Sequence, residues 1–306
     1  MSGSILTNTS SMTALSTLRS ISAQLEETQK HISTGLRIVE ASDNIAYWGV
    51  SSTMRSDASV LGTVKDALHM GKGKLDQATK AAKQIKDEIT QIKKDMSQIA
   101  SAKTNDERIE EIKKDIASSL DNIKNAISNA SMDGENLLAS ATTASGAADD
   151  SFTFVSSFRR VGHNVVVDTI KLKKDDTRLF GVDGQDVPIE TAGKLKDLFN
   201  SKTFDFTGAS RDDAIKKASN IVEQALNDVS SVEISLGAVT RQVNNQVTFI
   251  DALTDNLTKS IGTLVDADMD AQSARLSALQ VQQQLAVQSL SLANQSTQHI
   301  LALYKN

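Results

Sequence analysis

Apolar or small residues return with alternating spacings of three and four in the second half of the chain, between Ile215 and Leu264. This is the heptad pattern of a helix that buries one stripe against other helices. The stripe consists of Ile215, Ala218, Val222, Ala225, Val229, Val232, Leu236, Val239, Val243, Ile250, Leu253 and Leu257, with Gln246 in the gap. No proline interrupts it. The pattern predicts one continuous helix of about 50 residues, roughly 75 Å long at ~1.5 Å per residue.

The first half of the chain carries three stripes of the same kind. The first stripe ends at Gly35 and consists of Leu15, Leu18, Ser22, Leu25, Gln29 and Ile32. The second consists of Leu75, Ala78, Ala82, Ile85, Ile89, Ile92, Met96 and Ile99. The third consists of Ile109, Ile112, Ile116, Leu120, Ile123 and Ile127. Residues 103–106 separate the second stripe from the third, which predicts an antiparallel hairpin of helices. The expected second helix starts near Ile45, after a loop that holds Ser42, Asp43 and Asn44.

The pattern changes in the middle of the chain. Asp133-Gly134 is a strong turn signal, and Ser140 to Ala148 is a run of small and polar residues. Short β-branched or aromatic runs follow at 152–155, 165–167 and 179–187, separated by glycines. The predicted fold is therefore mainly α: long antiparallel helices form an elongated coiled-coil rod, with a small β-containing outer domain in the middle of the sequence.

Composition agrees with this fold and excludes several functions. The chain is 39% hydrophobic but only 4% aromatic, with one proline in 306 residues, which is typical of a helical protein rich in Ala, Ile, Leu and Val. A net charge of -5 gives no electrostatic footprint for nucleic acid. The chain has no cysteine and hence no disulfide. We expect no membrane span and no cleavable secretory signal, because the start lacks a basic segment with an apolar core and the uncharged stretch 276–304 is too polar.

The two ends share an unusual feature. No Asp, Glu, Lys or Arg occurs from Met1 to Leu18 or from Leu276 to Tyr304, although the body between them is rich in charge. A helix on the surface of a monomer normally carries Lys and Glu on its outer face. The pattern therefore predicts that the ends are buried against other copies of the chain and fold when those copies assemble.

Four segments of the chain resemble bacterial flagellins, in order and at the corresponding ends. They are SILTNTSSMTALSTLRSI from Ser4, ISTGLRIVEASDNIAYWGVSSTMRSD from Ile32, SMDGENLL from Ser131 and LQVQQQLAVQSLSLANQSTQHILALY from Leu279. The version around Ser42 to Trp48 is similar to flagellins of the alphaproteobacterial, rhizobial type. It departs at Asn44, Ile45 and Tyr47 from the family's more usual Asp-Asp-Ala-Ala-Gly run.

The resemblance implies a structural subunit that is exported unfolded through the flagellar type III apparatus and polymerises into the extracellular filament used for swimming. It implies three parts: residues 1–44 with 265–306 as a terminal coiled coil in the filament core, 45–138 with 211–264 as a helical rod domain, and 139–210 as a small variable outer domain with β-hairpins. Expected partners are further copies, other flagellins, an export chaperone, the filament cap and hook-junction proteins.

The stripes and the resemblance together give the expected packing residues. For the filament core these are Leu15, Leu18, Leu25, Ile32, Leu276, Leu279, Ala286, Leu290, Ala293 and Ile300. For the rod they are Ile85, Ile89, Ile92, Met96, Ile99, Ile112, Ile116, Ile123, Val229, Val232, Leu236, Val239, Val243, Ile250 and Leu253. By analogy, the export chaperone is expected to contact Leu285, Leu292 and Leu303.

No residue pattern indicates catalysis, a cofactor or a metal. His31, His69, His163 and His299 are scattered singly, without a second ligand at metal spacing. Asp266, Asp268 and Asp270 imitate the start of a calcium loop, but the required glycine and glutamate are replaced by Ala271 and Ser277, so a role at a helix start is expected. Tyr47 and Trp48 are expected to fill the junction between inner and outer helices.

Two other functions stay open on the sequence alone. A hook-filament junction protein shares the end helices and the logic of assembly. A soluble coiled-coil scaffold or secreted effector would use the same stripes to bind unrelated partners. An enzyme is not expected.

Overall fold

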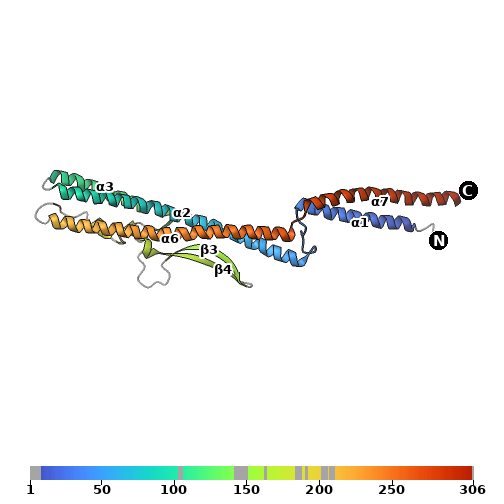
Figure 1. Cartoon of the computed structure of the whole chain (residues 1–306), viewed down its shortest axis with the longest axis horizontal. Helices are drawn as coiled ribbons and strands as arrows, with labels where there is room; N and C mark the ends of the chain where they lie inside the picture. The colour runs from blue at the N-terminus through green and yellow to red at the C-terminus, as the bar shows by residue number, and fades with distance from the viewer. Residues whose placement is uncertain are drawn as a thin grey trace. The chain divides into compact units, whose positions relative to one another are not determined.

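The computed structural model describes residues 8–102, 106–140, 151–161, 164–182, 188–189, 192–200, 206 and 211–304; the side chains of 161, 188–189 and 296–304 are outside this description. Its helices are α1 (Thr9–Thr34), α2 (Ile45–Ser101), α3 (Asp106–Ser128), α4 (Lys174–Thr177), α5 (Lys196–Asn200), α6 (Arg211–Val265) and α7 (Met269–Tyr304). Its strands are β1 (Ser131–Met132), β2 (Glu135–Asn136), β3 (Ser151–Val161), β4 (Asn164–Lys173), β5 (Gly181–Val182) and β6 (Pro188–Ile189). The predicted fold class, long helices with a small β-containing middle, is confirmed (Figure 1).

The chain divides into two compact units. One consists of Met1–Ser59 and Thr254–Asn306, and the other of Val60–Leu253. In the first unit the two terminal helices, α1 and α7, pack along each other. The second unit holds most of α2, all of α3, most of α6 and the β-strands.

In the second unit, α2 runs antiparallel to both α3 and α6, side by side with them (Figure 1). Lys65, Lys86 and Lys93 of α2 bind Asp251, Glu233 and Glu223 of α6, with Nζ to carboxylate oxygen distances of 2.5, 2.6 and 2.5 Å. The partner numbers fall as the α2 numbers rise, which is the signature of antiparallel helices. The Lys93–Glu223 bridge is exposed, and the other two are partly exposed, so these bridges set the register more than they stabilise the fold.

The apolar stripes meet in the interior of this unit, as heptad spacing requires. The residues predicted to pack the rod are buried, except Ile116 and Leu253, which are half-buried. Phe206, which precedes α6 in the chain, is also buried. It lines a cavity of about 120 Å³ together with residues of α2, α3 and α6. Phe206 belongs to no periodic stripe, so its burial could not be predicted from the residue pattern.

The β-region is built from hairpins, as predicted. Strands β3 and β4 pair antiparallel from Ser151↔Lys173 to Val161↔Asn164, with a bulge between Val155 and Ser157. Between β1 and β2, Asp133 and Gly134 have φ of 55° and 73°, the left-handed geometry of a tight hairpin turn. Phe152, Phe154 and Phe158 on β3 are buried, and the Phe180 ring meets that of Phe199 edge-on at 4.9 Å.

Candidate polymerisation surface on the terminal helices

The terminal helices α1 and α7 form an antiparallel pair, which Figure 1 shows side by side. At one end, Asn8 Nδ2 donates to the Ala293 carbonyl at 3.1 Å and Ser11 Oγ donates to Asn294 Oδ1 at 2.8 Å. At the other end, the backbones of Leu36 and Asp266 form an isolated antiparallel β-bridge. Beside it, the Ala267 N–H donates to the Gly35 carbonyl at 2.9 Å. The pair is therefore fixed in register at both ends by hydrogen bonds.

Both helices begin with a local cap, and α1 also ends with one. The Asn8 side chain accepts from the Ser11 N–H at the start of α1, and Gly35 ends α1 with φ of 70°, which a residue without a Cβ adopts without strain. Asp268 Oδ1 accepts from the N–H groups of Asp270 and Ala271 at 3.1 Å each, so it caps α7 in the helix-start role expected for this acidic run. The Gly35 stop was predicted from the sequence, whereas the Asn8 cap was missed.

Few side chains in the seam between the two helices are fully buried. Among the described side chains of α1 and α7, only Thr28 and Leu279 are less than 9% exposed. The other residues predicted to pack the filament core are half-buried at Leu18, Leu25, Ile32, Leu276, Ala286, Leu290 and Ala293; Leu15 is exposed, and the Ile300 side chain lies outside the described residues. Thr28 was not predicted; its hydroxyl is satisfied by the Gln24 carbonyl at 2.7 Å.

Large apolar side chains project from the pair into solvent. Met12 and Leu15 on α1, and Val281, Leu285, Val287 and Leu292 on α7, are between 38% and 67% exposed. Each would contribute about 1.5–3 kcal/mol on full burial. No charged side chain lies among them on α7 after Arg275. Such a surface is suited to burial against another protein rather than to permanent contact with water.

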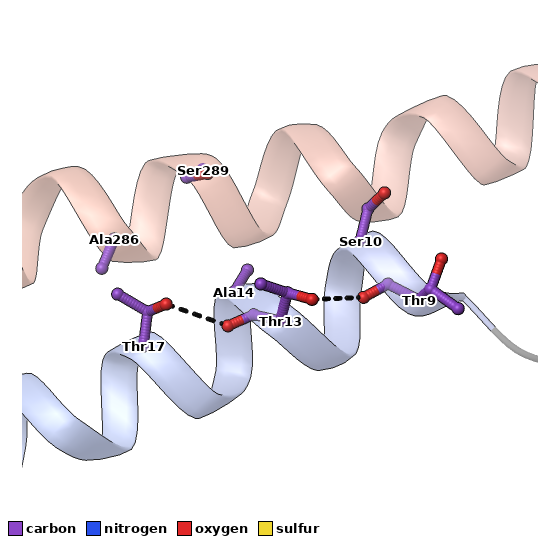
Figure 2. A pocket seen from close by; sticks show the side chains of 7 residues that line it. All are labelled: Thr9, Ser10, Thr13, Ala14, Thr17, Ala286 and Ser289. Atoms are coloured by element: carbon purple, nitrogen blue, oxygen red, sulfur yellow. Dashed lines mark hydrogen bonds between the residues drawn. The ribbon is translucent and has the colours of Figure 1, made fainter.

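A groove runs between α1 and α7 near the start of α1 (Figure 2). Its volume is about 460 Å³, and its walls are Thr9, Ser10, Thr13, Ala14, Thr17, Ala286 and Ser289. The Thr13 and Thr17 hydroxyls donate to the carbonyls of Thr9 and Thr13, one turn earlier, at 2.9 and 3.0 Å. An apolar side chain can therefore enter the groove without taking a partner from these hydroxyls.

The loop between α1 and α2 is held by a local acidic cluster. Asp43 Oδ2 accepts from the N–H groups of Glu40 and Val39 at 2.9 and 2.8 Å, and these bonds hold the pKa of Asp43 below its ordinary value. Lys30 Nζ donates to Glu40 Oε1 at 2.6 Å. At the end of the loop, Asn44 Oδ1 accepts from the Tyr47 N–H at 3.1 Å and caps the start of α2.

The expectation that Tyr47 and Trp48 fill a junction between helices is wrong for the single chain. Tyr47 is 46% exposed and Trp48 41% exposed, on the first turns of α2. Their place on the first turns of α2 was predicted, but their exposure depends on which segments pack there, and the residue types do not show that. Leu285 and Leu292, expected to meet a chaperone, are also exposed, and the Leu303 side chain lies outside the described residues.

Two further kinds of site are absent from the described residues. Within them, no group of three His, Asp or Glu side chains has the geometry to hold a metal ion. In the same part of the chain, no helix is both long and apolar enough to cross a membrane.

Comparison with known proteins identifies both helical regions. The sequence profile of the bacterial flagellin N-terminal helical region matches residues 5–143, and that of the C-terminal helical region matches residues 219–304. The chain is 43% identical to a flagellin of Brucella melitensis and 35% identical to flagellin C of Rhizobium meliloti, covering 99% of each chain in both cases.

Among solved structures, a putative flagellar hook-associated protein from Vibrio parahaemolyticus has a similar fold. The TM-score is 0.53 at 10% identity, over 73% of this chain and all of the other. At this identity the likeness concerns the fold alone.

Proposed function

The chain belongs to the bacterial flagellin family, and from this we propose that its terminal helix pair, α1 with α7, is the element through which the subunit polymerises. The protein is a structural subunit of the flagellar filament, an extracellular appendage. One observation carries the proposal: the pair buries few side chains fully, and its charge-free segments, 9–18 and 276–295, expose large apolar side chains. A helix pair of this kind gains most of its stability from neighbours.

The three parts of the subunit have different roles in this proposal. Residues 1–44 with 265–306 form the filament core, residues 45–138 with 211–264 form the tube around it, and residues 139–210 face outward. The core is packed by Leu15, Leu18, Leu25, Ile32, Leu276, Leu279, Ala286, Leu290, Ala293 and Ile300. Support comes from charge: residues 1–18 and 276–304, both in the proposed core, carry no Asp, Glu, Lys or Arg. In contrast, α2 and α6 are joined by lysine–acid pairs, which suit an exposed tube.

Before assembly, the terminal segments are unfolded during export and are covered by a chaperone. Leu285 and Leu292 support this role because they are exposed on α7, where a chaperone groove could take them as helical anchors at heptad spacing. Leu303 follows Leu292 by 11 residues, about three helical turns, so the sequence places it on the same helix face. The filament cap, the hook-junction proteins and other flagellins are the remaining partners of the assembled subunit.

Seeded polymerisation of the purified chain tests the proposal. Filament fragments added to monomer should elongate into long helical fibres, seen by sedimentation and electron microscopy. Deletion of residues 285–306 should abolish elongation, and so should Leu290→Lys, which places an unpaired charge in the packed core. Ser231→Lys, at an exposed position of α6, is the matched control and should elongate normally. An unmodified chain that never elongates on any seed would contradict the proposal.

A further inference from the structure

The terminal pair presents different surfaces on its two flanks. Successive residues of a helix are about 100° apart, so Thr13 and Leu15 flank the inward-facing Ala14 on opposite sides. On α7, Ser289 and Val287 flank Ala286 in the same way. Thr13 and Ser289 both line the groove, which places them on one flank of the pair (Figure 2). Leu15 and Val287 therefore lie on the other flank.

That second flank carries the exposed apolar side chains of Leu15 and Val287, and exposed Met12 adjoins Leu15 on the side of α1 that faces away from α7. We call these three residues the knob: Met12, Leu15 and Val287. They are 66%, 38% and 53% exposed. Met12 and Leu15 are three residues apart, which makes them neighbours on the surface of α1. Leu15 and Val287 each directly follow a groove residue, Ala14 and Ala286, so the knob lies at the same level of the pair as the groove.

We propose that in the filament the knob of one subunit inserts into the groove of the next subunit. The inference rests on the proposed function, and it names the partner surface of the terminal pair. The groove spans Thr9 to Thr17, about 12 Å at ~1.5 Å per residue, which is longer than the single turn from Met12 to Leu15. Small walls facing large side chains are the complement that knobs-into-holes packing requires.

The occupant is a second copy of this chain for two reasons. Neither surface carries a charged side chain, in a chain of which 23% of residues are charged, so no oppositely charged partner is selected. The shape that fits the groove is also present on the same chain, at the same level and on the opposite flank. A contact between different surfaces of identical subunits does not close on a dimer, and it continues from copy to copy as a helical polymer requires.

Cysteine cross-linking in filaments tests the contact, because the chain has no cysteine of its own. Filaments grown from a mixture of Leu15→Cys and Ser289→Cys subunits should give cross-linked dimers on oxidation or with a short bismaleimide, and filaments of either variant alone should not. A chain with both substitutions should give a ladder of multimers. The matched control pairs Leu15→Cys with Ser291→Cys, an exposed position of α7 off the groove.

The outcomes separate this inference from the proposed function. Normal filaments in which the Ser289→Cys mixture gives no more dimer than the Ser291→Cys mixture would overturn the contact and leave polymerisation intact. So would a Ser289→Cys thiol that reacts with a bulky maleimide as fast in filaments as in monomer. An unmodified chain that fails to elongate would overturn the proposed function, and this contact with it.

A double-mutant cycle gives a second readout that is insensitive to local folding defects. Leu15→Ala shortens the knob and Ser289→Leu fills the groove, and each should raise the critical concentration for elongation about tenfold. The double variant should raise the critical concentration by much less than the product of the two single effects, because its shortened knob meets a groove that is already filled. The two side chains lie on opposite flanks within one chain, so such coupling arises between subunits; strictly multiplicative effects would overturn the contact.

Discussion

The Phe154 ring of β3 lies directly against Gly71 in the middle of α2. A Cβ built on Gly71 would be 2.7 Å from Phe154 Cδ1, closer than side-chain carbons approach each other. The hairpin is thus seated on the helix at a position where the helix has no side chain. This contact explains a glycine inside a long helix, where it otherwise costs about 1 kcal/mol relative to alanine.

Gly71→Ala is expected to destabilise the second unit, although alanine favours helix. The helix gains about 1 kcal/mol, but displacing a buried aromatic ring costs typically 1–3 kcal/mol, so we expect a net loss of about 1 kcal/mol. Gly237→Ala in α6 is the control, since nothing lies within 4 Å of its added Cβ, and it should stabilise by up to about 1 kcal/mol. Urea unfolding followed by circular dichroism measures both; a Gly71→Ala variant as stable as Gly237→Ala would show that the hairpin is not seated there.

Asp95 is expected to make stability depend on pH. Asp95 is 4% exposed, its Oδ1 accepts from Gln91 Nε2 at 3.0 Å, and its Oδ2 has no hydrogen-bond partner among the described residues. Burial raises the pKa of Asp95, and the nearby Asp115 raises it further. The folded state therefore binds the proton more tightly than the unfolded state, so stability rises as pH falls from above the raised pKa toward the ordinary value of 3.8.

Asp95→Asn should flatten this part of the pH profile. The neutral side chain cannot ionise, so the variant should be more stable than the parent at pH 7, by about 1–2 kcal/mol, because it removes the cost of burying a negative charge. The difference should shrink in acid, where Asp95 is protonated. Urea midpoints between pH 4 and 7 measure it, with Asp87→Asn, an exposed position of the same helix, as control. A parent and variant with parallel profiles would rule out this role.

Asn8 is expected to stabilise the start of α1 in the filament. Its side chain accepts from the Ser11 N–H and donates to the Ala293 carbonyl, so one residue caps α1 and ties it to α7. Asn8→Ala should cost about 0.5–2 kcal/mol per subunit, as lost helix caps do, and lower the temperature at which filaments depolymerise. Ser16→Ala, at an exposed position of α1, should leave that temperature within about one degree of the parent value because surface changes are small.

The terminal pair is expected to be far less protected than the rod in the monomer. Amide exchange of monomer should be fast over residues 276–303 and slow over 229–243, where Val229, Val232, Leu236 and Val243 are fully buried. In filaments both segments should be slow. Strong protection of 276–303 in the monomer would show that the ends fold before assembly.

Much of this protein follows from its residue pattern alone. Stripes such as Ile85, Ile89 and Ile92 place an apolar side chain on each turn of one helix face, and that relation is local to the chain, so the helices and their buried faces could be predicted. The turn at Asp133-Gly134 and the stop at Gly35 were predicted for the same reason, because the required backbone angles belong to single residues.

Other features depended on which segments meet, and these only the tertiary structure decided. Phe206 is buried although it belongs to no stripe, and Thr28 is buried at the edge of one. Tyr47 and Trp48, in contrast, are exposed despite their size. The groove between Thr13 and Ser289 exists because two antiparallel helices, about 270 residues apart in sequence, are held in one register by Asn8 and Gly35. Periodicity determines which face of a helix is apolar; register and packing determine which neighbours that face meets and which flank is left open for the next subunit.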